Sequence, residues 1–224
     1  MQTYSHFILT AALRKPIGGQ AAAHPNRWPK LRTGAILLGS IIPDMPLTLV
    51  AIITIIRDMW TGAFAQIDFE ALEPGLPTPS EWLDISMTMR LFDLWFFENP
   101  WMITFHNLFH SPLLVAIYIG VAYWLWTRGT KGAGWFFWLS CAAMLHTLID
   151  IPLHTTDGPL LLFPLNWTWR YRSPISYWDP QYYGTQWSYF EHALDVVLLG
   201  YLGWLYWRPM VGWFRRRFVK VQTA

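Results

Sequence analysis

The segment His146-Thr-Leu-Ile-Asp-Ile-Pro-Leu-His154 lies at the end of a long apolar run, residues 134–153. An apolar run of this length can cross the hydrocarbon core of a bilayer as a helix. Ionisable side chains in a lipid-embedded helix are energetically unfavourable, and their presence usually indicates a function. The segment holds two histidines and an aspartate, so it predicts both a membrane-spanning helix and a polar site within it.

The spacing in this segment favours a metal site. His146 and Asp150 are four residues apart and therefore share one face of a helix. Pro152 bends or ends the helix, which lets His154 turn back toward the other two side chains. Two imidazoles and a carboxylate in this arrangement suit a zinc-type ion. The alternative is a pair of hydrogen-bonded core histidines beside a buried carboxylate, but the further ionisable groups at similar depth favour the metal.

The composition is typical of a membrane protein. Of the 224 residues, 54% are hydrophobic and 13% are charged, and the chain has 16 Trp, 14 Phe and 10 Tyr. This composition is too apolar for an ordinary soluble domain, and the length suits a single membrane-embedded domain over residues 1–224. The net charge of +2 is too small to indicate nucleic-acid binding. The single cysteine, Cys141, excludes an intrachain disulfide and any CxxC metal motif.

The hydrophobic pattern predicts an all-α membrane protein with four transmembrane helices. The stretches long enough to span a bilayer are 33–56, 101–126, 134–153 and 187–207. The apolar stretch 4–13 is too short to span and predicts a short partial helix. Outer loop 57–100 contains a Pro- and Gly-rich segment and then an amphipathic helix at 80–97, with Ser80 as its N-cap. Outer loop 154–186 is expected to form an ordered lid.

Charge asymmetry predicts the orientation of these spans. With both termini in the cytoplasm, 12 of the 16 Lys and Arg residues lie on the cytoplasmic side, as the positive-inside rule requires. Ten of the 14 acidic residues fall in the two outer loops, and none falls on the cytoplasmic side. The remaining four acids lie within spans, at Asp44, Asp150, Glu191 and Asp195.

The polar residues within the spans share one depth. Asp44 lies near the middle of the first span, between Pro43 and Pro46, and broken helices at membrane depth usually line a cavity. The other candidates lie in the outer halves of later spans: His106, His110, His146, Asp150, Glu191, His192 and Asp195. Each has a local explanation, such as capping for His106 or an interhelical hydrogen bond for His110. Together they predict one site, open to the outer face, because facing lipid would be unfavourable for each of them.

Several of these residues occur in an order that resembles a known family. The matching positions are His6, Gly39, Pro43, Asp44, His106, His110, Ser111, His146, Asp150, Thr155, Gly158, Leu161 and Pro164. This order resembles the inner-membrane metal-dependent hydrolase family known as YdjM-like, which is thought to be remotely similar to zinc-dependent phospholipase C and the P1-type nucleases. The resemblance covers most of the chain through Pro164 and weakens after it.

The resemblance implies a helical bundle in a bacterial inner membrane that holds two or three zinc ions and hydrolyses phosphoester bonds. The positions matching its metal ligands are Asp44, His106 or His110, His146, Asp150 and His154. Asp150 would bridge two ions. In the soluble relatives the last helix supplies a His and a Glu four residues apart. Here Glu191 and Asp195 have that spacing, whereas His192 is followed four residues later by Val196.

Two functions of different kinds are consistent with these residues. The first is hydrolysis of a lipid-like phosphoester at the outer face, with Asp44 or Glu191 as general base and Arg170 and Arg172 of the lid attracting the phosphate. Membrane lipid is then the substrate and partner.

The second is a catalytically silent accessory or scaffold subunit of a larger membrane complex. Its partner surface would be aromatic: Trp124, Trp126, Trp135, Trp138, Trp204, Trp207 and Trp213. Haem or chlorophyll ligation ranks last, because it needs one exposed His per pigment rather than a cluster with carboxylates.

Overall fold

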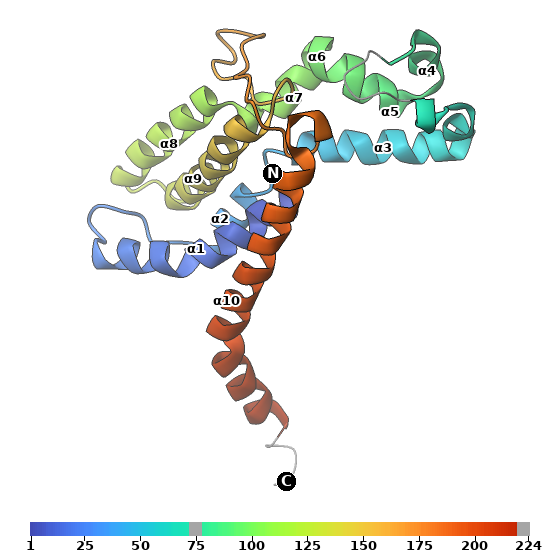
Figure 1. Ribbon diagram of the computed structural model, residues 1–224. Helices are drawn as coiled ribbons and strands as arrows, with labels where there is room; N and C mark the ends of the chain where they lie inside the picture. Colours follow the sequence, from blue (N-terminus) through green and yellow to red (C-terminus); the bar gives the residue numbers. More distant parts are fainter. Residues whose placement is uncertain (72–77, 219–224) are drawn as a thin grey trace.

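The computed structural model describes residues 1–71 and 78–218, which form an all-helical molecule (Figure 1). This confirms the predicted all-α class. Within the described residues no strand forms, and the only strand-like pairing there is an isolated antiparallel bridge between Leu160 and Arg170. The Pro- and Gly-rich segment of the first outer loop falls largely on residues 72–77, outside the described residues.

Ten α-helices are labelled along the described chain. They are α1 Thr3–Ala23, α2 Thr33–Gly39, α3 Met45–Thr61, α4 Ser80–Ile85, α5 Met87–Arg90, α6 Phe96–Glu98, α7 Pro100–His110, α8 Pro112–Thr127, α9 Ala133–Asp150 and α10 Gly184–Phe218. Short turns of 3-10 helix occur at Ala63–Gln66, Phe69–Ala71, Ile151–Leu153 and Pro180–Tyr182, and a π-helical turn lies at Leu91–Trp95.

Helix α9 is central to the core. With the turn that follows it, Ala133–Leu153 forms 21 residues that are apolar and long enough to cross a membrane, in agreement with the predicted third span. Helices α2 and α8 both pack against α9. The contact with α2 is close because Gly39 has no side chain: a Cβ there would lie 2.2 Å from the carbonyl oxygen of Leu139.

The predicted second span is bent in its middle. Helices α7 and α8 meet at Ser111 at an angle of 49°, and only together are they long and apolar enough to span a membrane. Pro112 begins α8, and Ser111 before it has an extended backbone, as a residue preceding proline favours. The Ser111 hydroxyl donates a hydrogen bond to the Phe163 carbonyl at 3.0 Å, which ties the bend to the second outer loop.

The predicted first span is two helices. Residues 40–44 separate α2 from α3, and α3 points away from the α8–α9 pair in Figure 1 and packs against α5 and α7. Pro43 and Pro46 account for the break, because a proline lacks the N–H that would continue the helix. Among the described residues, only Ala133–Leu153 passes as a span by itself, with the bent α7–α8 pair as a second. The structure therefore supports up to two spans by length and composition.

Two predicted elements differ from those observed. The N-terminal helix runs from Thr3 to Ala23, with Pro16 inside it, so the short partial helix at 4–13 was wrong. The apolar pattern ends near Leu13, but the helix continues through Arg14, Lys15 and Pro16 to Ala23. The amphipathic helix predicted at 80–97 is broken at Ser86, and Ser80 is its first helical residue rather than its N-cap. Instead, the Ser86 side chain caps α5 by accepting the Met89 N–H.

The second outer loop lies over the end of α9, as the prediction of an ordered lid requires (Figure 1). Backbone bonds anchor it there: Tyr177 N–H donates to the Leu153 carbonyl at 2.9 Å. The side-chain oxygen of Asn107 on α7 accepts the Leu160 N–H at 3.1 Å. Helix α10, longer than the predicted 187–207, then packs along α1.

Candidate metal centre

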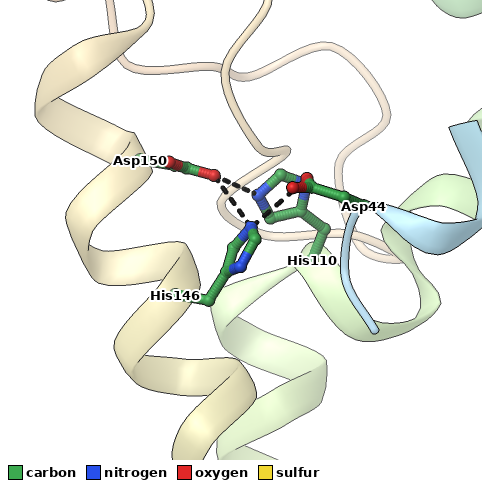
Figure 2. A group of neighbouring side chains, drawn as sticks. All are labelled: Asp44, His110, His146 and Asp150. Atoms are coloured by element: carbon green, nitrogen blue, oxygen red, sulfur yellow. Dashed lines mark hydrogen bonds and ion pairs between the residues drawn. The ribbon is translucent and has the colours of Figure 1, made fainter. Parts of the chain in front are cut away.

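Four side chains meet at the C-terminal end of α9, and Figure 2 shows them pointing toward one another. They are Asp44, His110, His146 and Asp150, and their ligand atoms all lie within 4.8 Å of one another. The predicted convergence of the first three spans on one site is therefore observed in the described residues. Three of the four are buried, and the side chain of Asp44 is 20% exposed.

Local sequence explains how each residue reaches the group. His146 and Asp150 lie on one face of the last turns of α9, as their spacing requires. His110 is the last residue of α7, immediately before the bend at Ser111. Asp44 precedes α3 in the proline-rich break, so its side chain is free to face α9. The broken helices therefore contribute the two candidate ligands that α9 does not supply.

The two ring nitrogens of His146 have different surroundings. Its Nδ1 lies 2.7 Å from the Ser40 carbonyl oxygen, which can only accept, so Nδ1 carries the proton. Its Nε2 lies 3.0 Å from Asp150 Oδ2 and 3.3 Å from Asp44 Oδ1, yet it has no hydrogen-bond partner. A nitrogen lone pair facing two carboxylates is unfavourable, and either a proton on Nε2 or a metal cation shared by the three groups would remove the repulsion. A backbone partner on Nδ1 is also the usual outer-shell arrangement of a metal-bound histidine.

The distances within the group fit a zinc-type ion. His110 Nε2 lies 3.1 Å from Asp150 Oδ2. Neighbouring ligands of a tetrahedral zinc site lie about 3.4 Å apart when each bond is about 2.1 Å. Two imidazoles and two carboxylates are also a donor set that zinc accepts. The residues therefore fit a divalent ion in both chemistry and spacing.

His6 of α1 adds a third imidazole beside the group. Its Nε2 lies 2.9 Å from Asp150 Oδ1, and its ring stacks on that of His146 with 3.7 Å between centroids. The Met1 amino group also lies 2.9 Å from Asp150 Oδ1. The sequence left the role of His6 open, since its helix could not be placed. The one signal was its position in the family-like order of motifs.

His106 contacts the four-residue group through His110. Its Nε2 lies 2.9 Å from His110 Nδ1, so it orients the ring whose other nitrogen faces Asp150. Both histidines are buried. Of the predicted His106 and His110 pair, His110 therefore belongs to the four-residue group. His106 is not part of the group and contacts it through His110.

His154 lies in the lid, outside the four-residue group. Its Nδ1 is 3.0 Å from Asp157 Oδ1, and the Trp178 indole N–H donates to Asp157 Oδ2 at 2.9 Å. Burial disfavours the charge on Asp157, but its contacts with His154 and Trp178 outweigh burial and lower the pKa of Asp157. The three side chains form a separate polar cluster above α9.

The site residues predicted on the fourth span, Glu191, His192 and Asp195, instead contact residues at the start of the chain. Glu191 is buried, and its two oxygens accept hydrogen bonds from the Gln2 N–H at 2.7 Å and the Trp187 indole N–H at 3.0 Å. Asp195 accepts the Ser5 hydroxyl at 2.7 Å. His192 is exposed, 3.5 Å from the Tyr4 hydroxyl. None of the three lies in the four-residue group.

The two lid arginines differ in their surroundings. Arg170 is partly buried, with its guanidinium 4.9 Å from the centroid of the Phe96 ring, and it donates to the Gly158 carbonyl. Burial lowers the pKa of Arg170 to about 10, so the side chain stays charged at neutral pH. Arg172 is exposed.

The fold and the site together describe an all-helical protein with a buried candidate metal centre at the end of its central helix. Comparison with known protein families, curated proteins and solved structures finds no match for this chain.

Proposed function

We propose that this protein is a metal-dependent hydrolase of a bacterial inner membrane, a zinc phosphoesterase that acts on a lipid-like substrate at the outer face. The observation that carries the proposal is the convergence of Asp44, His110, His146 and Asp150, whose ligand atoms all lie within 4.8 Å of one another. The resemblance to the YdjM-like family supports the same chemistry. Both termini are then cytoplasmic, in keeping with the charge asymmetry.

The four converging side chains would hold the ion. A divalent ion there would polarise a phosphoryl oxygen and lower the pKa of water. Asp150 is the residue suited to bridge two ions, since its Oδ2 faces His110 and His146 while its Oδ1 faces His6. Two or three ions, as the resemblance implies, would draw on this shared carboxylate.

Asp44 is the better candidate for general base. It is the most exposed carboxylate of the group. Its Oδ1, which faces His146, would contact the ion, while its Oδ2, held in place by a hydrogen bond from the Thr3 hydroxyl at 2.5 Å, would accept the proton. Glu191 would first have to release two N–H donors. Arg170 keeps a charged guanidinium in the lid, where it would attract the phosphate.

Exposed apolar side chains support a place in the membrane. Trp60 on α3 is 90% exposed and Val196 on α10 is 69% exposed, within long apolar faces of both helices. Surfaces of this extent mark contact with lipid or with another protein. Together with the apolar α9, they favour lipid.

Elemental analysis of purified protein tests the metal centre directly. Wild type should contain zinc at one or more equivalents per chain, whereas Asp150→Asn should contain less than a tenth of that amount. Asn keeps the shape of the side chain and removes its charge, so this variant tests ligation rather than packing. His24→Ala, which removes an exposed histidine at the end of α1, is the matched control and should retain the metal.

Zinc at wild-type stoichiometry in Asp150→Asn would reject the ligand assignment. Hydrolysis is measured on the same samples with a chromogenic phosphodiester and with phosphatidylglycerol in mixed micelles. Wild type should release product, and the release should fall together with the zinc content. If the protein binds zinc but hydrolyses neither substrate, the metal centre is supported and the phosphoesterase assignment is rejected.

An accessory or scaffold subunit of a larger membrane complex is the second candidate. The exposed aromatic side chains that favour it include Trp124, Trp204 and Trp207. Trp138, predicted on that surface, is buried and donates to the Pro29 carbonyl, so that part of the prediction was wrong. The side chain of Trp213 lies outside the described residues. Metal-free protein that co-purifies in a defined complex under mild detergent would favour this function.

A further inference from the structure

A second polar site lies far from the metal centre. Helix α1 carries His6 near one end, and its second half lines a cavity of about 540 Å³ together with the loop before α2 and the end of α8. Ala22, which lines this cavity, lies sixteen positions after His6 in the chain. That separation corresponds to about 24 Å along a straight helix. The mechanism proposed above uses none of these residues.

The cavity combines cations with apolar walls. Arg14, Lys15 and Lys30 line it, and Trp28, Leu31 and Trp126 supply apolar surface. No Asp or Glu occurs anywhere in residues 1–43 or 99–149, the segments from which the lining comes. The positive charge of the cavity is therefore not neutralised by its own walls.

One of the cations is held in place. Arg14 donates to the Thr33 hydroxyl at 3.1 Å and to the Tyr206 hydroxyl, and its guanidinium lies 5.3 Å from the centroid of the Tyr206 ring. These partners are neutral, so the guanidinium is oriented without losing its charge. Lys15 and Lys30 are exposed and can reach an anion at the cavity mouth.

We propose that this cavity binds an anionic phospholipid, with the phosphate near Arg14, Lys15 and Lys30 and the first part of an acyl chain against Trp126, Leu31 and Trp28. Charge complementarity selects the anionic head group, because clusters of Lys and Arg beside an apolar surface attract anionic lipid. The apolar walls select a lipid over a free phosphate ion. The inference is independent of the metal centre and goes beyond the hydrolase function.

Native mass spectrometry of the full chain in detergent tests this site. Phosphatidylglycerol is titrated into wild type and into Lys15→Gln/Lys30→Gln, and the Kd of the first bound lipid is measured. Loss of the two lysines should raise that Kd about tenfold. Arg128→Gln/Lys131→Gln, which removes two basic residues that do not line the cavity, is the matched control and should stay within about twofold of wild type.

A second variant tests the cavity itself without changing charge. Ala22 lines the cavity and is exposed, so Ala22→Trp should fill the space and weaken phosphatidylglycerol binding while the fold is kept. Thermal melting and zinc content should match wild type in every variant. These two measurements separate a failure of this site from a failure of the metal centre.

Three results would overturn the inference. Equal affinity for phosphatidylcholine would show that the cations do not select the head group. Displacement of the lipid by equimolar inorganic phosphate would show a phosphate-ion site rather than a lipid site. Equal weakening in the Arg128→Gln/Lys131→Gln control would show that the lipid responds only to overall charge.

Discussion

At the scale of single residues, the orientation of His146 decides the chemistry of the centre. The Ser40 carbonyl fixes the proton on Nδ1, and this leaves Nε2 directed between Asp44 and Asp150. Ser40 belongs to the break between α2 and α3, so the break positions both a candidate ligand, Asp44, and the carbonyl group that orients a second candidate ligand, His146. Outer-shell partners of this kind hold the ring and raise its basicity as a ligand.

His6 should contribute to metal affinity through Asp150. Because it lies 2.9 Å from Asp150 Oδ1 and stacks on His146, its loss frees two ligands at once. We expect His6→Ala to weaken zinc binding about 10- to 100-fold, as loss of an outer-shell partner does. Competition with a fluorescent zinc chelator measures the change. His192→Ala removes an exposed histidine of α10 and should leave the affinity unchanged; equal weakening in both variants would contradict the role of His6.

Asp58 should make the stability of the protein depend on acid pH. It lies beyond the predicted spans and is buried, and it accepts the Ser86 hydroxyl at 2.6 Å and the Thr88 N–H at 2.8 Å. Burial disfavours its charge, but the hydrogen bonds from Ser86, Arg57 and Thr88 outweigh burial and lower the pKa of Asp58.

A carboxyl whose pKa is lowered in the folded state stabilises that state at any pH above its unfolded pKa of about 3.9. The stabilisation is lost as the pH falls through the lower folded value. Thermal melting between pH 7 and pH 2 should therefore show a steep loss in wild type below about pH 4. Asp58→Asn should be less stable at pH 7 and lose less on acidification. Asp84→Asn, which changes an exposed carboxylate, is the control. If both variants lose the same stability between pH 7 and pH 2, Asp58 is not the source of the acid sensitivity.

At the scale of elements, proline and glycine decide where helices stop and how closely they pack. Pro43 and Pro46 separate α2 from α3, and Pro112 bends the chain at Ser111. The first break follows from two prolines close together within an apolar run. The bend at Ser111 was not expected, because a proline in the first turn of a helix is compatible with a straight continuation of the apolar pattern.

Two glycines of the same helix should respond oppositely to alanine. A Cβ on Gly39 would lie 2.2 Å from the Leu139 carbonyl oxygen, so Gly39→Ala must push α2 away from α9. We expect it to destabilise the protein by about 1–3 kcal/mol, as overpacking of a core does. It should also weaken zinc binding, because Ser40 beside it orients His146.

Gly34 is the matched position, since a Cβ there meets nothing within 4 Å. Gly34→Ala should be neutral or stabilising by up to about 1 kcal/mol, through the higher helix propensity of alanine. Chemical unfolding of both variants in detergent measures the difference. A Gly39→Ala protein as stable as Gly34→Ala would show that the close contact between α2 and α9 is not needed.

At the scale of the whole molecule, the charge asymmetry predicts how the protein lies in the membrane. Reporter fusions after Gly75 and after Gln181 should report the outer compartment, and a fusion after Lys131 should report the cytoplasm. The physical reason is that 12 of the 16 Lys and Arg residues lie on the predicted cytoplasmic side, whereas ten of the 14 acidic residues lie in the two predicted outer loops. A cytoplasmic signal from the Gly75 fusion would overturn the orientation, and signals of one kind from all three would show that α9 does not cross the membrane.

The helical class, the central apolar helix and the candidate ligand pair on that helix all follow from the amino-acid sequence. These follow from local rules: hydrophobic length predicts α9, and a spacing of four residues places His146 and Asp150 on one helical face. The shared depth of the polar residues also predicted that Asp44 and either His106 or His110 would join them, because burying each one alone would be unfavourable.

Which polar residues belong to the candidate centre depends on contacts between helices that are distant in sequence. The bend at Ser111 points His110 rather than His106 into the group, the lid pairs His154 with Asp157, and the packing of α10 on α1 pairs Glu191 and Asp195 with backbone and hydroxyl donors. His6 enters because hydrogen bonds from Gln2 to Glu191 and from Ser5 to Asp195 hold the start of α1 against α10. Local periodicity contains no information on such contacts, since they depend on how helices distant in sequence pack together.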